Sequence, residues 1–123
     1  MDDKPMQSIY QNNPAFWEAL DQLISQKGIT IDRPKGTKHP RFTEFIYPYD
    51  YGYINQTQST DGEGLDVWVG TSEIRKVSAI LNIVDMDKLD TELKILFATT
   101  PRETEEIFKI NNEIMMHAVL LHR

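Results

Sequence analysis

The chain has 123 residues, of which 40% are hydrophobic and 26% are charged, and it carries a formal net charge of −6 and no cysteine. These values predict one globular domain over residues 1–123 and exclude disulfides and thiolate metal sites. The negative charge argues against a general nucleic-acid-binding protein, for which a basic footprint is expected. The amino terminus does not resemble a secretory signal, and no apolar run approaches the ~20 residues of a membrane span. We therefore expect a cytoplasmic protein without a nucleic-acid or membrane partner.

Helical signals begin at residue 13. Asn13 before Pro14 is typical of an N-cap followed by proline at the first helical position, and Gly28 is a typical helix stop. Apolar residues recur between them at helical spacing, at Phe16, Leu20, Leu23 and Ile24. They predict an amphipathic helix that packs on the body of the protein and carries no chemistry. Residues 29–32 then alternate as in a strand.

Residues 35–42 form a basic loop, which carries Lys35, Lys38, His39 and Arg41. A basic loop ahead of an acidic one is what a metal–phosphate site needs, because phosphate oxygens that the metal leaves free require cationic partners. A solvated charged turn is the alternative.

Tyrosines and carboxylates concentrate in the middle of the chain. Residues 47–54 read Tyr-Pro-Tyr-Asp-Tyr-Gly-Tyr-Ile and hold four of the five tyrosines. Asp61, Glu63 and Asp66 follow within six residues, on a loop with two glycines. Carboxylate oxygens at this density suit a hard divalent cation such as Mg2+. The alternative is a solvated acidic turn, because Asp-Gly is a common turn dipeptide.

The second half of the chain predicts three strands and a helix. The strands are expected over residues 65–70, 77–85 and 93–98, where apolar and β-branched residues dominate. Residues 100–103, Thr-Pro-Arg-Glu, form a capping box with proline at the first helical position. The helical spacing of Ile107, Ile110, Ile114 and Leu121 predicts that this helix runs to near His122.

Two segments resemble the signature of the family I soluble inorganic pyrophosphatases. In that family Tyr-Pro-x-x-Tyr-Gly leads into Asp-x-Asp-Pro-hydrophobe-Asp-hydrophobe. Residues 47–52 match the first part in full, and residues 61–67, Asp-Gly-Glu-Gly-Leu-Asp-Val, match the second with two substitutions. A second acidic cluster fits as well, because Asp87, Glu92 and Lys94 reproduce the spacing of two acids and a lysine in the family. The resemblance implies a mainly β fold with flanking α-helices, built on a small closed OB-like β-barrel.

The resemblance also implies an activity, namely Mg2+-dependent hydrolysis of pyrophosphate to two phosphates by metal-activated water. The implied metal ligands are Asp61, Asp66, Asp87 and Glu92. Glu63 takes the position of the acid that orients or deprotonates the water, and we expect it to form the catalytic group with Asp61 and Asp66. Asp32 falls where the family has an acidic residue of the metal or phosphate shell.

Substrate binding is implied for Arg41, which falls on a phosphate-binding lysine of the family, and for Lys94, Tyr47 and Tyr51. For the two tyrosines, packing within the core is the alternative. The family's hairpin with a second phosphate-binding arginine is missing between Thr43 and Tyr47. Either Lys35 or Lys38 takes over its role, or one phosphate is held less well.

The chain departs from the family at several positions. Glu63 and Glu92 replace aspartates, Gly64 replaces a proline, Thr43 replaces a glutamate, and the final helix lacks a Tyr-Lys pair that holds phosphate. Two alternatives follow: a hydrolase of another phosphoanhydride on the same scaffold, or a non-catalytic relative that binds metal or phosphate. The apolar tail over residues 114–121 leaves a homo-oligomer open, with packing on its own barrel as the alternative.

Overall fold

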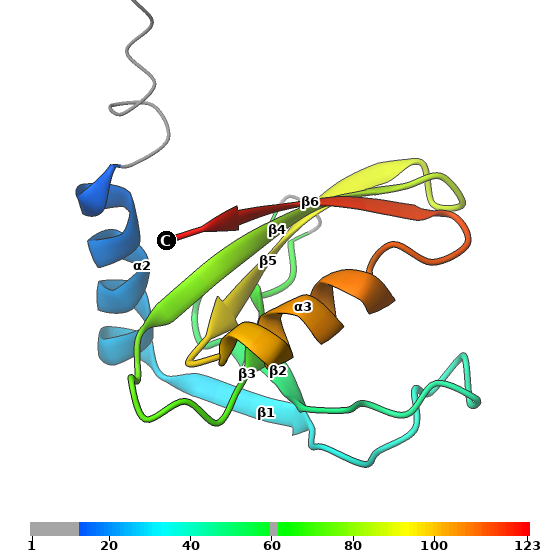
Figure 1. Cartoon of the computed structure of the whole chain (residues 1–123), viewed down its shortest axis with the longest axis horizontal. Coiled ribbons are helices and arrows are strands. Elements are labelled where there is room, and N and C mark those ends of the chain that lie inside the picture. The colour runs from blue at the N-terminus through cyan, green and yellow to red at the C-terminus, as the bar shows by residue number, and fades with distance from the viewer. Residues whose placement is uncertain (1–12, 60–61) are drawn as a thin grey trace, which may run out of the picture.

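The structure is a computed structural model that describes residues 13–59 and 62–123. Within these residues two helices and six strands follow one another as α2 (Pro14–Lys27), β1 (Ile29–Arg33), β2 (Asp50–Ile54), β3 (Asp66–Val69), β4 (Val77–Asp85), β5 (Asp90–Phe97), α3 (Pro101–Ile110) and β6 (Met116–His122) (Figure 1). The mainly β fold with flanking helices is thereby confirmed. Neither described helix is long and apolar enough to cross a membrane.

The strands form one sheet in the order β1-β2-β3-β5-β4-β6. All neighbouring strands are antiparallel except β3 and β5, which run parallel. Strands β1 and β6 end the order and do not pair with each other, so the sheet is open. The closed OB-like barrel expected from the sequence is therefore not confirmed.

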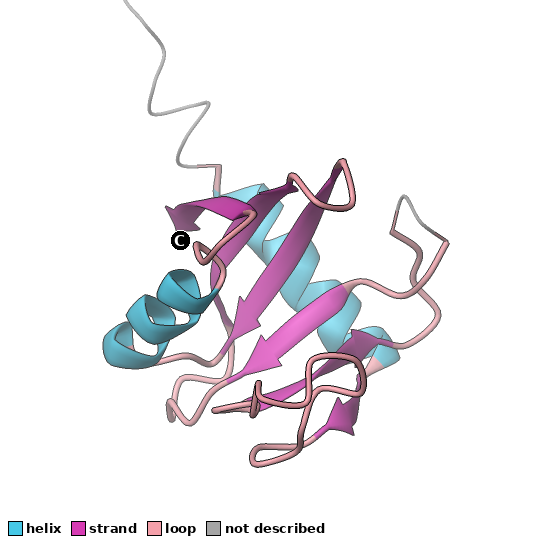
Figure 2. Cartoon of the chain, turned by 90° about the vertical axis from the view of Figure 1, so that its right-hand side faces the viewer, coloured by secondary structure: helices cyan, strands magenta, loops and turns pink. Residues whose placement is uncertain are grey.

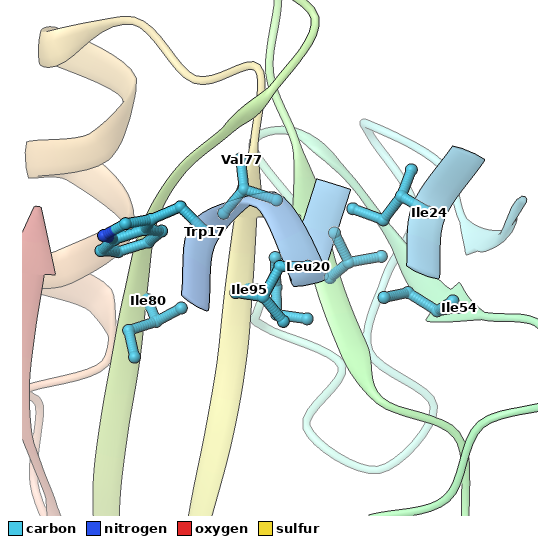
Figure 3. Close-up of a cluster of buried hydrophobic side chains, with 8 residues drawn as sticks. Trp17, Leu20, Ile24, Ile54, Val77, Ile80 and Ile95 are labelled. Atoms are coloured by element: carbon cyan, nitrogen blue, oxygen red, sulfur yellow. The ribbon is translucent and has the colours of Figure 1, made fainter. Parts of the chain in front are cut away.

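Each face of the sheet carries its own apolar cluster, because successive side chains of a strand point to opposite faces. On one face Trp17, Leu20 and Ile24 of α2 pack in a cluster with Ile54 and Ile95 (Figure 3). On the other face Ile107 of α3 joins a cluster with Tyr47, Tyr51, Trp68 and Leu96. In Figure 2, α2 runs behind the strands, whereas α3 lies nearer the viewer.

The helix starts follow from local signals. The Asn13 side chain accepts a 3.1 Å hydrogen bond from the backbone of Ala15, and the Gly28 N–H closes α2 on the carbonyl of Ile24 at 2.8 Å. At α3 the capping box is present, with the Thr100 hydroxyl bound to the N–H of Glu103. Both predicted starts are confirmed.

The prediction that the last helix runs to near His122 is wrong. Helix α3 ends at Ile110, the Asn111 side chain binds the carbonyl of Ile107, and residues 116–122 form strand β6 beside β4. Met116, Ala118 and Leu120 of this strand pack in the cluster beneath α3, while Ile114 is 91% exposed. Pairing with the open edge of β4 and burial of alternate residues therefore outweigh the helical spacing, which is a local signal only.

Gly52 sets how closely β1 approaches β2. A Cβ at this position would lie 1.8 Å from the carbonyl oxygen of Thr30. Only glycine lets the two backbones come together here. The same pair of strands carries a bulge, which bears on the site described next.

Candidate active site

The site begins where the parallel strands β3 and β5 lie side by side. Their register places Asp66 directly beside Lys94. Glu92 lies two residues before Lys94 and therefore on the same face of the sheet. On the other side of β3, strand β2 contributes Tyr51, which pairs with Trp68. Four predicted site residues thus come from three adjacent strands, on the face that carries α3.

Tyr51 joins the basic and the acidic side of this group. The Lys94 ammonium donates a 2.9 Å hydrogen bond to the Tyr51 hydroxyl. Burial raises the pKa of Tyr51 well above its ordinary value, and the negative charge of Asp66 and a hydrogen bond with it add to the shift. The phenol therefore stays protonated and accepts from Lys94, with the carboxylate of Asp66 close by.

Asp66 and Glu92 form a carboxylate pair. Burial raises the pKa of Glu92 to about 7, with a further contribution from the hydrogen bond with Asp66, while the charge of Lys94 opposes the rise. Two carboxylates in contact do not both ionise readily, since like charges disfavour each other. Near neutral pH, Glu92 therefore still holds a proton for much of the time.

Lys94 is a partly buried cation in this group. Burial lowers its pKa, and the nearby carboxylates of Glu92 and Asp66 oppose that effect. Within the described residues it forms no ion pair with N···O at or below 4.0 Å. Its ammonium is bonded to a neutral hydroxyl and keeps donors for a further acceptor.

Tyr47 extends the site toward the sheet edge. Its ring lies 5.3 Å from the ring of Tyr51 and 5.7 Å from that of Trp68. The His39 ring stacks on the Tyr47 ring, with 6.1 Å between the ring centroids. Both site tyrosines are buried in the apolar cluster, yet each hydroxyl binds a cationic side chain, Arg33 for Tyr47 and Lys94 for Tyr51. Core packing and a position at the site, the two alternatives from the sequence, thus occur together.

Arg33 is the residue that sequence reasoning missed. The pairing of β1 with β2 shifts between Ile31 and Arg33, so that Ile31 pairs with Gly52 and Arg33 pairs with Tyr51. This bulge leaves Asp32 exposed and places Arg33 on the face of Tyr51. A basic residue at the end of a strand and ahead of a basic loop was the available signal, but a bulge cannot be read from alternation.

Two of the other predicted acids, Glu63 and Asp87, are exposed. Asp61 lies outside the described residues. Glu63 is exposed on the loop before β3, and Asp87 is exposed in the turn between β4 and β5, where its N–H binds the Asp85 carboxylate at 2.9 Å. Among the residues that the structure describes, no three His, Asp or Glu side chains gather as a metal-binding group.

The remaining predicted basic residues lie in the loop between β1 and β2, and all three are exposed. The Lys35 N–H donates to the Asp50 carboxylate. Lys38 forms an isolated β-bridge with the exposed Ile46, which points to the side opposite its buried neighbour Tyr47. The Arg41 N–H donates to Nδ1 of His39 at 3.0 Å, and the His39 ring stacks on that of Tyr47. The structure does not bring these three side chains into contact with Tyr51 or Lys94.

His39 lies in a region of positive electrostatic potential. Burial lowers its pKa, and the charges of Arg33 and Lys94 lower it further. Its Nδ1 accepts from the backbone of Arg41 and Phe42, which requires that nitrogen to be unprotonated. Cationic side chains around Tyr47 and Tyr51 thus lie near the carboxylate pair that includes Asp66. Such a site can bind an anion at its cationic side chains and a metal cation at its carboxylates.

Comparison with known proteins identifies the family of the chain. The family model described as inorganic pyrophosphatase matches residues 27–120. The inorganic pyrophosphatase of Buchnera aphidicola is 33% identical over 76 residues, which are 57% of this chain and 42% of that protein. The chain thus matches about two fifths of the length of this curated relative.

Solved structures share the fold. The crystal structure of an inorganic pyrophosphatase from Neisseria gonorrhoeae has a TM-score of 0.60 at 18% identity, over 79% of this chain and 84% of that one. The inorganic pyrophosphatase of Thermus thermophilus has a TM-score of 0.52 at 18% identity, over 77% and 81% of the two chains. At this identity the likeness concerns the fold alone.

Proposed function

Because the chain belongs to the inorganic pyrophosphatase family, we propose that it hydrolyses inorganic pyrophosphate to two phosphates and that it requires Mg2+. The observation that carries the proposal is the contact chain from Lys94 through Tyr51 to Asp66 and Glu92. It joins a cation that can bind phosphate to a carboxylate pair that can bind metal.

The carboxylate pair fits a magnesium ion. Asp66 and Glu92 lie close together in a partly buried place, where the pKa of Glu92 is raised, and a divalent cation would relieve the repulsion between their charged forms. Mg2+ typically binds through one or two carboxylates, keeps several waters and takes phosphate oxygens as further ligands. Asp66 and Glu92 would hold the ion, with Asp61 and Asp87 as further ligands. The chemistry that Mg2+ supplies is to lower the pKa of water and to neutralise charge on the phosphates.

The remaining roles fall to side chains of the chain itself. Lys94 and the Tyr51 hydroxyl would bind phosphate oxygens next to the carboxylate pair. Glu63, on the loop that leads into β3, would orient the attacking water and accept its proton. Tyr47 would line the anion side, and Arg41, with Lys35 and Lys38 on the same loop, would meet the outer part of the substrate.

Release of phosphate from pyrophosphate, with Mg2+ or with EDTA, tests the proposal. We expect Mg2+-dependent turnover that falls by at least about 10²-fold in Asp66→Asn and in Glu63→Gln, because a misplaced or missing group at the reacting centre costs this much. Glu105→Gln on the exposed side of α3 serves as the matched control and should keep wild-type turnover.

Three results would contradict the proposal. Turnover that neither Asp66→Asn nor Glu63→Gln changes would contradict the assignment of the site. Absence of turnover, with Mg2+ binding that Asp66→Asn abolishes, would favour a different phosphoanhydride, which a panel of nucleoside di- and triphosphates would identify. Absence of both turnover and Mg2+ binding would indicate a non-catalytic relative.

A further inference from the structure

We propose that Arg33 binds a phosphate group of the substrate, at the end of the site that lies away from Asp66 and Glu92. This inference rests on the proposed function and adds to it a residue that neither the motif nor the predicted loop lysines supply.

The bulge in β1 brings Arg33 to the site. With regular alternation Ile31 and Arg33 would share one face, but they pair with the consecutive residues Gly52 and Tyr51 and therefore face opposite ways. Arg33 then lies on the face of Tyr51 and is partly buried, whereas Asp32 is exposed. The strand end thus presents a guanidinium rather than a carboxylate to the tyrosines.

The guanidinium keeps most of its donors. Arginine has five N–H donors, and within the described part of the chain one of them, on Nη1, binds the Tyr47 hydroxyl. No carboxylate of the described residues lies within ion-pair distance of Arg33. A partly buried cation with a neutral partner and free donors is suited to an anion from outside, since buried charges are usually paired.

Arg33 and Lys94 hold the same tyrosine pair from two directions. Arg33 binds the Tyr47 hydroxyl from β1, Lys94 binds the Tyr51 hydroxyl from β5, and the two rings lie 5.3 Å apart. Lys94 is the cation beside the carboxylates, so Arg33 is left for the phosphate farther from them. Its planar fork can bind two oxygens of one phosphate, which a lysine cannot do.

The exposed basic residues of the loop are weaker candidates for this role. Lys35, Lys38 and Arg41 are exposed, and none has a contact with Tyr47 or Tyr51 through its cationic group. An exposed lysine must give up side-chain freedom to hold one phosphate, whereas the hydrogen bond to Tyr47 already orients Arg33.

Three variants test the role of Arg33, with calorimetric binding of pyrophosphate in EDTA and steady-state kinetics in Mg2+ as readouts. Arg33→Met should weaken pyrophosphate binding by about 10- to 100-fold and raise KM more than it lowers kcat, because one charge-assisted contact is lost. Arg33→Lys keeps the charge and should recover part of the affinity. Arg102→Met removes an arginine whose side chain is 88% exposed and should bind pyrophosphate as the wild type does.

Tyr47→Phe separates binding from a structural role. It leaves the charge of Arg33 in place but removes its hydrogen-bond partner, so affinity should fall by less than in Arg33→Met. Unfolding temperatures measured on all variants identify any loss of fold. If Arg33→Met fails to fold, Arg33→Lys decides the question, since loss of the planar fork should still weaken binding several-fold.

The outcomes distinguish this inference from the proposed function. Wild-type binding of pyrophosphate that Arg33→Met weakens supports the inference even where no turnover is found, a result that would overturn only the hydrolase proposal. Normal turnover with unchanged KM and affinity in Arg33→Met overturns the inference and leaves the hydrolase proposal intact. A lower unfolding temperature with unchanged affinity assigns Arg33 a structural role and overturns the inference as well.

Discussion

The Lys94 ammonium donates its hydrogen bond to the Tyr51 hydroxyl across an intervening strand, so that a side chain of β5 reaches over β3 to a side chain of β2. This contact lies next to Asp66 and joins the two halves of the site. The Tyr51 hydroxyl has two neighbours of opposite charge, so its removal affects both.

We expect Tyr51→Phe to lower kcat/KM for pyrophosphate by about 10- to 100-fold. The change leaves a partly buried ammonium without its acceptor and Asp66 without a donor, and contacts of charged groups are worth about 1.5–3 kcal/mol. Steady-state kinetics measure the effect. Tyr49→Phe is the matched control, because the Tyr49 hydroxyl binds Glu106 on α3. Equal losses in both variants would show that the effect is one of packing.

The stability of the metal-free protein should depend on Glu92 between pH 4.5 and pH 7. The folded state raises the pKa of Glu92 from 4.5 to about 7, so in this window it holds a proton that the unfolded chain has released. The free energy of unfolding is therefore not reduced by Glu92 below pH 4.5, and it declines as the pH rises toward 7. Glu92→Gln should remove the decline, and at pH 8 its Tm in EDTA should exceed that of the wild type by about 4 °C or more.

Asp90→Asn gives the control for this pH dependence, because Asp90 is an exposed acid of the same strand. Its melting profile should follow that of the wild type. A Glu92→Gln profile that runs parallel to the wild type between pH 5 and pH 8 would contradict the raised pKa of Glu92.

Glu103 should stabilise the fold at neutral pH and lose its effect in acid. Burial would raise its pKa, but hydrogen bonds from Thr100 and Thr71 outweigh burial and lower it below 4.5. A lowered pKa means that the contribution is present above 4.5 and is lost as the pH falls through the folded value. Glu103→Gln should cost about 1.5–3 kcal/mol at pH 7 and less at pH 3.5, as urea unfolding would show. The exposed Glu105→Gln should cost much less at either pH.

Gly52→Ala should destabilise the protein by about 3 kcal/mol, toward the upper end of overpacking costs. The added methyl group collides with the Thr30 carbonyl and pushes β1 away from β2. Gly36→Ala is the comparison, since its Cβ meets no atom within 4 Å and only its φ of +90° opposes the change. That variant should cost about 1–2 kcal/mol. Denaturant unfolding that ranks Gly36→Ala as the worse change would contradict the close approach of β1.

The elements that the sequence predicted well are those with local signals. Asn13, Gly28 and Thr100 fix helix ends through their own side chain or backbone, so their effect is visible in the sequence. Strand β6 was missed because the free edge of β4 decides its conformation, and that edge exists only in the folded sheet. The closed barrel followed from the resemblance alone, and the open strand order does not confirm it.

The candidate site was predictable to a similar extent. Asp66, Glu92, Lys94 and Tyr51 were named from motif spacing, but only the parallel pairing of β3 with β5 shows that they meet. Glu63 and Asp87 lie on exposed loops, and Asp61 lies outside the described residues, so their roles stay predictions. Arg33 could not be found from alternation, because the bulge inverts the face that alternation assigns.

The bulge in β1 means that spacing, rather than the identity of the residues, decides which sign of charge faces the tyrosines. If regular pairing continued from Ile31 beside Gly52, Asp32 would lie opposite Tyr51 and turn its carboxylate toward it, and the guanidinium of Arg33 would point to the opposite side. The end of β1 would then repel the anions that it now attracts, although its sequence would still read Asp-Arg-Pro. A register shift by one residue can thus reverse the polarity of this site with every charged residue retained.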